Sequence, residues 1–283
     1  MFIVDAQVHL SGPDGKPRRG QISGGVFAEE VLQEMDKAGV TRAVLAGTSF
    51  DPHSNQQCLD AAIKYPDRFA VFSGINLKDP DIREKIRNWK QTPGLYGLRA
   101  NTRKLATDAP DSLKPDHWLW SALEDAQIPT MVRAADHIEC LKPIVDRHPG
   151  LKLSLCHMAA NTYGRKDEAV FDHLPVLLEL AKHPNVTLKA TGLPTYSTEA
   201  YPFPRLHEPL RKLYEAYGAS RMFWGTDLTR ATYWDLPGRP RKATYRQAVA
   251  MFTEELPWLK EKDKELTMGR AICDWIGWPV RPQ

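Results

Sequence analysis

Side chains that can move protons or hold a charge stand at the ends of several short apolar runs in this sequence. In the first run, Asp5, Gln7 and His9 alternate with apolar residues, so the period of a strand places all three on one face, pointing into a barrel. Three later runs end in polar groups, which are Arg133, His157 and Asp227. A carboxylate, two imidazoles and a guanidinium in one cavity supply a base, proton donors and a fixed positive charge, which suits the attack of water on a carbonyl.

Eight runs are rich in apolar residues, as expected for the strands of a parallel sheet that is buried on both faces. They span residues 2–9, 42–47, 69–75, 95–100, 128–133, 151–157, 186–191 and 221–227. Amphipathic helical patterns separate most of them, and a last helix is expected at 261–276. This alternation predicts a (β/α)8 TIM barrel, one domain over residues 1–283. Loops expected at 10–26, 102–114 and 228–242 then follow strands and build the C-terminal face, where the active sites of such barrels lie.

Net charge, apolar runs and cysteine spacing indicate which kinds of molecule this protein binds. The 283 residues carry a net charge of +3 with no dense Lys/Arg run, which does not favour nucleic acid, and no apolar run approaches the roughly 20 residues that span a membrane. The four cysteines are scattered without CxxC spacing, which indicates reduced thiols and a cytoplasmic protein. We therefore expect a small-molecule substrate, with no nucleic-acid or membrane partner. The apolar, Trp-containing segment 271–280 is compatible with a homodimer.

Several short motifs occur in a telling order. The chain reads VDAQVH in the first run, LKLSLCHMA in the sixth, RMFWGTD in the eighth and TMGRAICDWIGW near its end. In these motifs and their spacing it resembles the amidohydrolase superfamily, in particular the amidohydrolase-related branch that contains lactonases and decarboxylases. The resemblance covers nearly the whole chain and implies the same barrel fold.

The resemblance also implies where a metal site would lie. Metal-bearing members usually have a His-x-His on the first strand, a His ending the fifth and an Asp ending the eighth, and a His ending the sixth contacts substrate. This chain matches with His9, His157 and Asp227. It departs with Gln7 on the first strand and, at the end of the fifth, with Arg133 or its neighbour Ala134. A catalytic zinc site needs about three N, S or carboxylate ligands, and a guanidinium repels a cation. We expect no cofactor and no tightly held metal; if a weak Zn or Mn is present, His9, His157 and Asp227 are its ligands.

Without a metal, the resemblance and the chemistry of the side chains suggest roles for four residues. Asp227 is the candidate base for water, His9 and His157 polarise the carbonyl, and Arg133 holds the oxyanion or a substrate carboxylate. Some lactonases of this branch work without metal. A lactone or activated ester suits this equipment better than an amide, because an amide nitrogen is a poor leaving group.

Further residues near strand ends are candidates for binding substrate: Gln7, Arg99, Asn101, Tyr196 and Arg230. In relatives that act on dicarboxylates, an Arg at the position of Arg99 binds a carboxylate. Arg suits this role better than Lys because its guanidinium donates two parallel hydrogen bonds to a carboxylate. We therefore expect a small, anionic, cyclic substrate. The dicarboxylate lactonases carry more arginines after the sixth-strand His, where this chain reads HMAAN, which argues against that particular substrate.

Two other functions remain open. One is a divalent-metal-dependent decarboxylase of an aromatic or unsaturated acid, and the other is a non-catalytic barrel that binds a small molecule. Simpler structural readings also remain: Arg133 pairs with Asp136, Asp5 is a hydrogen-bonded structural acid, and Lys189 faces either the barrel or a helix.

Overall fold

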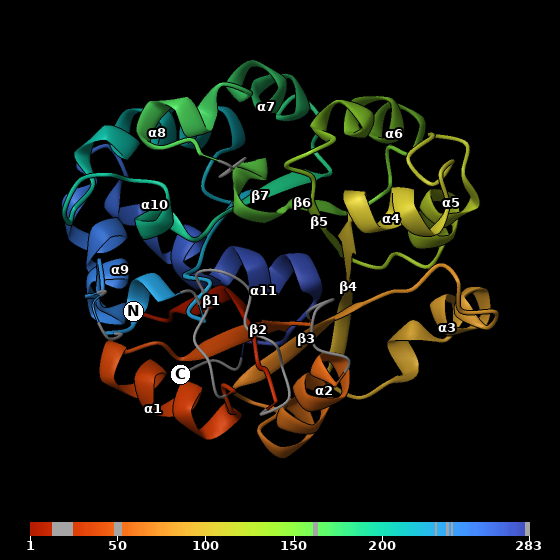
Figure 1. Ribbon diagram of the computed structural model, residues 1–283, viewed down its shortest axis with the longest axis horizontal. Coiled ribbons are helices and arrows are strands. Elements are labelled where there is room, and N and C mark those ends of the chain that lie inside the picture. Colours follow the sequence, from red (N-terminus) through yellow and green to blue (C-terminus); the bar gives the residue numbers. More distant parts are fainter. Residues whose placement is uncertain are drawn as a thin grey trace.

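The computed structural model describes residues 1–12, 25–47, 53–160, 164–229, 231–235, 238 and 240–280. Within them, eight strands form one parallel sheet in sequence order, and helices surround it (Figure 1). The strands are β1 (Val4–Val8), β2 (Arg42–Ala46), β3 (Phe69–Gly74), β4 (Leu95–Asn101), β5 (Thr130–Arg133), β6 (Leu153–Leu155), β7 (Val186–Ala190) and β8 (Met222–Trp224). Each lies inside a predicted run or extends past it by one residue. The predicted (β/α)8 barrel is confirmed.

The helices follow the strands as a TIM barrel requires. They are α1 (Ala28–Ala38), α2 (Ser54–Lys64), α3 (Ile82–Arg87), α4 (Thr102–Asp108), α5 (Trp118–Asp125), α6 (Leu141–Arg147), α7 (Leu174–Leu180), α8 (His207–Tyr217), α9 (Tyr245–Ala250), α10 (Glu261–Glu265) and α11 (Ala271–Ile276). A π-helical stretch, Leu266–Arg270, joins α10 to α11, so the chain is helical throughout the predicted 261–276. The loop predicted at 102–114 is wrong in its first half, because the Asn101 side chain accepts a hydrogen bond from the Arg103 N–H and begins α4 there.

Two apolar layers hold the barrel together. Side chains that point outward from the strands, such as Leu45, Val71 and Leu188, pack against the helices. Side chains that point inward, such as Val44 and Phe72, fill the barrel and continue into the C-terminal helix. This double burial explains why the strands read as continuous apolar runs.

The C-terminal segment closes one end of the barrel. Figure 1 shows α11 lying inside the ring of outer helices, and Trp275 on it stacks on Phe72 of β3 with ring centroids 6.2 Å apart. Ile272, Cys273 and Trp278 are buried with it. The apolar residues of 271–280 are thus largely used within their own chain, so they no longer argue for a homodimer.

A β-bulge changes the direction of side chains on β1. Asp5 pairs with Ala43 and Val8 with Leu45, so two residues of β1 oppose one residue of β2 between these pairs. The expectation that Asp5, Gln7 and His9 share one face is therefore wrong for Asp5, because strict alternation is lost at the bulge. Asp5 instead lies at the seam between β1 and β8.

The Asp5 carboxylate helps to close the barrel at that seam. Its Oδ1 accepts hydrogen bonds from the Gln7 N–H (3.0 Å) and the Thr226 N–H (2.9 Å). Its Oδ2 accepts from the Thr226 hydroxyl and from the Tyr245 hydroxyl of α9 (2.8 Å). The Asp227 N–H also donates to the Gln7 carbonyl at 2.8 Å. These bonds tie β8 to β1, where no ladder of paired strand residues is formed between described residues.

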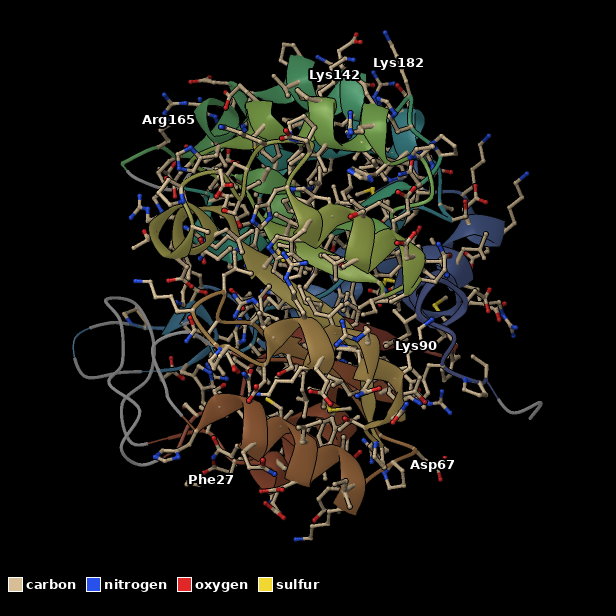
Figure 2. All side chains as sticks on the ribbon, turned by 90° about the vertical axis from the view of Figure 1, so that its right-hand side faces the viewer. Phe27, Asp67, Lys90, Lys142, Arg165 and Lys182 are labelled. Carbon is tan, nitrogen blue, oxygen red and sulfur yellow. The ribbon has the colours of Figure 1, made fainter. Side chains whose placement is uncertain are left out.

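Charged side chains cover the outside of the molecule. Figure 2 shows Lys142, Arg165 and Lys182 extending from its periphery. Along the described chain, no helix combines the length and apolar character that crossing a membrane requires.

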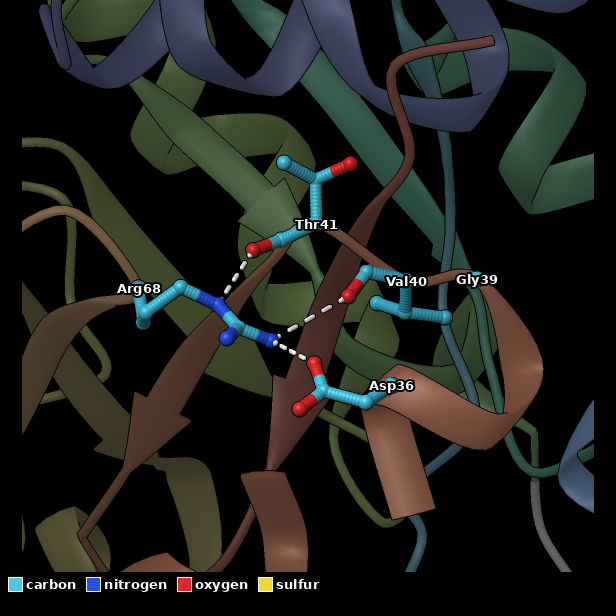
Figure 3. A pocket seen from close by; sticks show the side chains of 5 residues that line it. All are labelled: Asp36, Gly39, Val40, Thr41 and Arg68. Atoms are coloured by element: carbon cyan, nitrogen blue, oxygen red, sulfur yellow. Dashed lines mark hydrogen bonds and ion pairs between the residues drawn. The ribbon is translucent and has the colours of Figure 1, made fainter. Parts of the chain in front are cut away.

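A shallow pocket lies at the amino ends of β2 and β3, the opposite end from the carboxyl termini of the strands (Figure 3). Its Arg68 guanidinium donates to the Thr41 carbonyl (2.8 Å), the Val40 carbonyl (3.5 Å) and the Asp36 carboxylate (2.7 Å). These bonds tie α1 to the start of β3. In a TIM barrel this face serves stability, so we do not place the active site there.

Candidate active site

Five polar side chains meet at the carboxyl end of the barrel. His9 follows β1, His157 follows β6 and Asp227 follows β8, and their residues are 4%, 5% and 3% exposed. Gln7 of β1 and Lys189 of β7 lie one layer deeper, at 0% and 1%. The upper three therefore reach the mouth of the barrel, and the lower two support them.

Asp227 contacts both imidazoles of the upper layer, and its contact with His9 is the shorter of the two. His9 Nδ1 donates to the Ala46 carbonyl oxygen at 2.5 Å, and because that oxygen only accepts, the proton is on Nδ1. His9 Nε2 then lies 2.9 Å from Asp227 Oδ1. At this distance a proton that either group takes up can be shared between the two atoms. The pair is thus built to take up and release a proton.

Burial is the main electrostatic influence on His9. It lowers the pKa of the imidazole, and the positive charge of Arg99 lowers it further, whereas Asp227 opposes both. The neutral imidazole is therefore the favoured form at neutral pH. A neutral His9 has a lone pair on Nε2, so it can share a proton that Asp227 takes up.

His157 stands on an unusual turn. β6 ends at Leu155, and His157, Met158 and Ala159 follow with φ angles of 57°, 55° and 51°. Residues with a Cβ pay roughly 1–2 kcal/mol each for the left-handed region, and such outliers gather at functional sites. The turn aims the ring into the barrel, where Nε2 lies 3.0 Å from Gln7 Nε2 and 3.8 Å from Asp227 Oδ2.

Lys189 is a buried cation that sequence reasoning left unplaced. Its Nζ donates to Gln7 Oε1 at 2.5 Å and to Met131 Sδ at 3.2 Å, and the Cys156 thiol is within hydrogen-bonding reach. Burial lowers its pKa. Leu188 and Ala190 face the helices, so strand alternation places Lys189 between them on the inward face of β7. This alternation was the sequence signal that could have located Lys189.

The donor set does not match a catalytic metal site. His9 Nε2 and His157 Nε2 both face the amide nitrogen of Gln7, at 3.4 and 3.0 Å, rather than a shared open position. Among the described residues, no three His, Cys, Asp or Glu side chains are arranged to hold one ion. A charged Lys189 in the layer below would in addition repel a cation at this place. We therefore derive no chemical step through a metal.

The arginines occupy two different places. Arg99 of β4 donates to the Gly47 carbonyl, and its charge lowers the pKa of both His9 and Lys189, so it lies beside the cluster. Arg133 of β5 forms its ion pair with Asp136 at 3.6 Å, and Asp136 also binds Arg103 at 3.1 Å. Arg99 thus lies beside the cluster, whereas Arg133 forms an ion pair with Asp136 instead.

The other predicted binding residues are more scattered. The Asn101 side chain accepts the Arg103 N–H at the start of α4, next to Arg133 on the neighbouring strand. Tyr196 is fully buried within the outer apolar layer. Arg230 lies outside the described residues.

The sequence of the whole barrel identifies the family to which this chain belongs. A sequence model of the amidohydrolase family matches residues 4–270, so the chain belongs to that family and the resemblance is confirmed. Among individual proteins, the chain is 28% identical to the L-fucono-1,5-lactonase of Burkholderia ambifaria over 203 residues. That match covers 68% of this chain and 66% of the lactonase, just under two thirds of its length.

Solved structures share the fold at low sequence identity. A probable 2-pyrone-4,6-dicarboxylic acid hydrolase from Acinetobacter baumannii, with citric acid bound, has a TM-score of 0.76 at 17% identity and covers 98% of this chain and 100% of its own. An amidohydrolase from Burkholderia multivorans with bound zinc gives 0.76 at 16%, covering 99% and 100%. The 2,6-dihydroxybenzoate decarboxylase from Rhizobium gives 0.67 at 16%, covering 98% and 99%.

Proposed function

We propose that this protein hydrolyses a lactone, or a similarly activated ester, of a small anionic cyclic substrate without a catalytic metal. The observation that carries the proposal is the His9–Asp227 contact of 2.9 Å at the mouth of the barrel, with Arg99 beside it. The similarity to a lactonase supports lactone as the substrate class.

Asp227 is the proposed base. It takes a proton from water as the water oxygen forms a bond to the lactone carbonyl carbon, and His9 Nε2 at 2.9 Å shares that proton. The ring C–O bond then breaks, and the same proton passes to the leaving oxygen. Water and lactone become one hydroxy acid, so a single proton-carrying pair is sufficient for both halves of the reaction.

Positive charge at the mouth supports binding and oxyanion stabilisation. Arg99 is the guanidinium beside the cluster, and we assign it to the developing oxyanion or to a substrate carboxylate. Arg133 serves the same substrate only if it leaves Asp136, its partner at 3.6 Å. An anionic substrate competes with Asp136 for that guanidinium, which favours anions over neutral lactones.

Turnover of a lactone panel tests the proposal. The panel holds L-fucono-1,5-lactone, other aldonolactones with and without a carboxylate, and p-nitrophenyl esters, and acid release is followed with a pH indicator. We expect turnover that survives dialysis against a chelator, with less than one metal ion per chain. Loss of activity on chelation, restored by Zn or Mn, would overturn metal independence.

Two further outcomes separate the alternatives. Release of CO2 from 2,6-dihydroxybenzoate or a related acid, with a bound divalent ion, would favour the decarboxylase, whose fold this chain shares. No turnover of either panel, together with a rise in melting temperature with a small carboxylate, would favour a binding barrel.

A further inference from the structure

The two imidazoles of the site differ in what fixes their tautomers. His9 Nδ1 faces the Ala46 carbonyl, which accepts and never donates, so its proton is held on Nδ1. His157 Nδ1 faces the Thr191 hydroxyl at 2.6 Å, and a hydroxyl serves as donor or acceptor. The tautomer of His157 is therefore decided at its other nitrogen.

That other nitrogen faces the carboxamide of Gln7. Gln7 Nε2 lies 3.0 Å from His157 Nε2, and an amide nitrogen only donates, so His157 Nε2 carries the lone pair. If the carboxamide were reversed, its oxygen would face His157 and would call for a proton on Nε2. The orientation of Gln7 thus selects the tautomer.

Lys189 fixes the orientation of Gln7. Its Nζ lies 2.5 Å from Gln7 Oε1, and a reversed amide would point N–H groups at the N–H groups of the lysine. The other acceptors near Nζ are the sulfur atoms of Met131 and Cys156, which are weak, so Gln7 Oε1 is its strong partner. Lys189 is 1% exposed and lies below the layer that reaches the mouth.

We propose that Lys189 is a positioning residue that, through Gln7, holds His157 as the Nδ1–H tautomer. Its catalytic consequence rests on the proposed hydrolase function. A proton on His157 Nε2 would bring positive partial charge near Asp227 Oδ2, 3.8 Å from that nitrogen, and nearby positive charge makes a carboxylate a weaker base. With the lone pair on His157 Nε2, the Asp227 carboxylate remains a stronger base toward the attacking water.

Ring nitrogen NMR on histidine-labelled protein tests the proposal directly at pH 8, where an ordinary imidazole is neutral. In the wild type we expect Nδ1–H for both His157 and His9. Lys189→Met keeps the length of the side chain and removes its donors, so an Nε2–H form of His157 is expected to appear. His9 is the internal control, because Ala46 holds its proton in every variant. Lys90→Met, at an exposed position, is the matched surface control.

A second variant guards against misfolding of the first. Gln7→Met removes the carboxamide, and the Nε2–H form of His157 is expected there too. If His157 stays entirely Nδ1–H in both variants, or if the wild type carries the proton on Nε2, the proposal is overturned. This readout needs no substrate, so an absence of lactone turnover would refute the hydrolase and leave the tautomer result intact. Where turnover is found, we expect kcat of Lys189→Met to fall about tenfold or more with KM little changed.

Discussion

Replacing Asp5 with Asn should change how the stability of the barrel depends on pH. Asp5 is fully buried at the β1–β8 seam, and burial raises its pKa from 3.8 to about 6 against the opposing effect of four hydrogen bonds. A folded-state pKa above the unfolded one means that the stabilising contribution is complete below pH 4. It is lost as the pH rises through about 6, because the buried group must then ionise.

The size of this loss follows from the shift. A pKa that moves from 3.8 to about 6 corresponds to about 3 kcal/mol between pH 4 and pH 7. Asn stays neutral, and it fits the same partners. Its Oδ1 accepts from the two backbone N–H groups of Gln7 and Thr226, and its Nδ2 donates to the Thr226 and Tyr245 hydroxyls, which can rotate to accept.

Urea unfolding at pH 4, 5, 6 and 7 measures the difference. Asp5→Asn should gain about 3 kcal/mol relative to the wild type as the pH rises across this range, most of it between pH 4 and 6. Tyr245→Phe should act in the opposite sense, since it removes a hydroxyl that favours the ionised carboxylate. A difference between Asp5→Asn and wild type that is constant with pH would show that burial in this seam does not raise the pKa of Asp5.

Three further substitutions test the site and its support. Asp227→Asn should lower kcat/KM for a lactone by about a hundredfold or more with unchanged circular dichroism, and near-normal turnover would remove Asp227 as the base. Asp136→Asn frees Arg133 and should lower KM for a carboxylate-bearing lactone more than for a neutral one; equal effects on both would refute the competition. Glu124→Ala removes the acceptor of the His148 Nδ1–H (2.8 Å) and the Gly150 N–H (2.6 Å) and should cost about 1–3 kcal/mol in urea unfolding, whereas no change would show these bonds to be unimportant.

The barrel was predictable because its strands are apolar on both sides. Runs such as 69–75 and 186–191 read as strands whatever lies next to them, since inward and outward side chains are both buried. The predicted ends were less accurate where a strand runs into the site. The sixth run was expected to continue to His157, but β6 ends at Leu155 and the left-handed turn begins two residues later. No local pattern announces three consecutive residues with a Cβ in that region.

The site was predictable in its membership more than in its contacts. His9, His157 and Asp227 come together as strand-end placement predicts. The position of Asp5 was not predictable. A bulge depends on how β1 pairs with β2, and the sequence of β1 alone does not show that pairing. Lys189 was left open for a similar reason: its strong partner, Gln7, is 182 residues away.

The two departures from the metal-binding pattern have different structural consequences. Arg133 pairs with Asp136 at 3.6 Å and not with a member of the cluster. Gln7 stays inside, and its amide connects a lysine of β7 to an imidazole that follows β6, so each buried polar atom of the lower layer finds a partner of the right kind. Restoring a histidine at position 7 would therefore remove the acceptor of Lys189 and place an imidazole beside a buried cation. A single reversion of Gln7 to His should for that reason fail to create a zinc site, and it would need a neutral residue at position 189 to succeed.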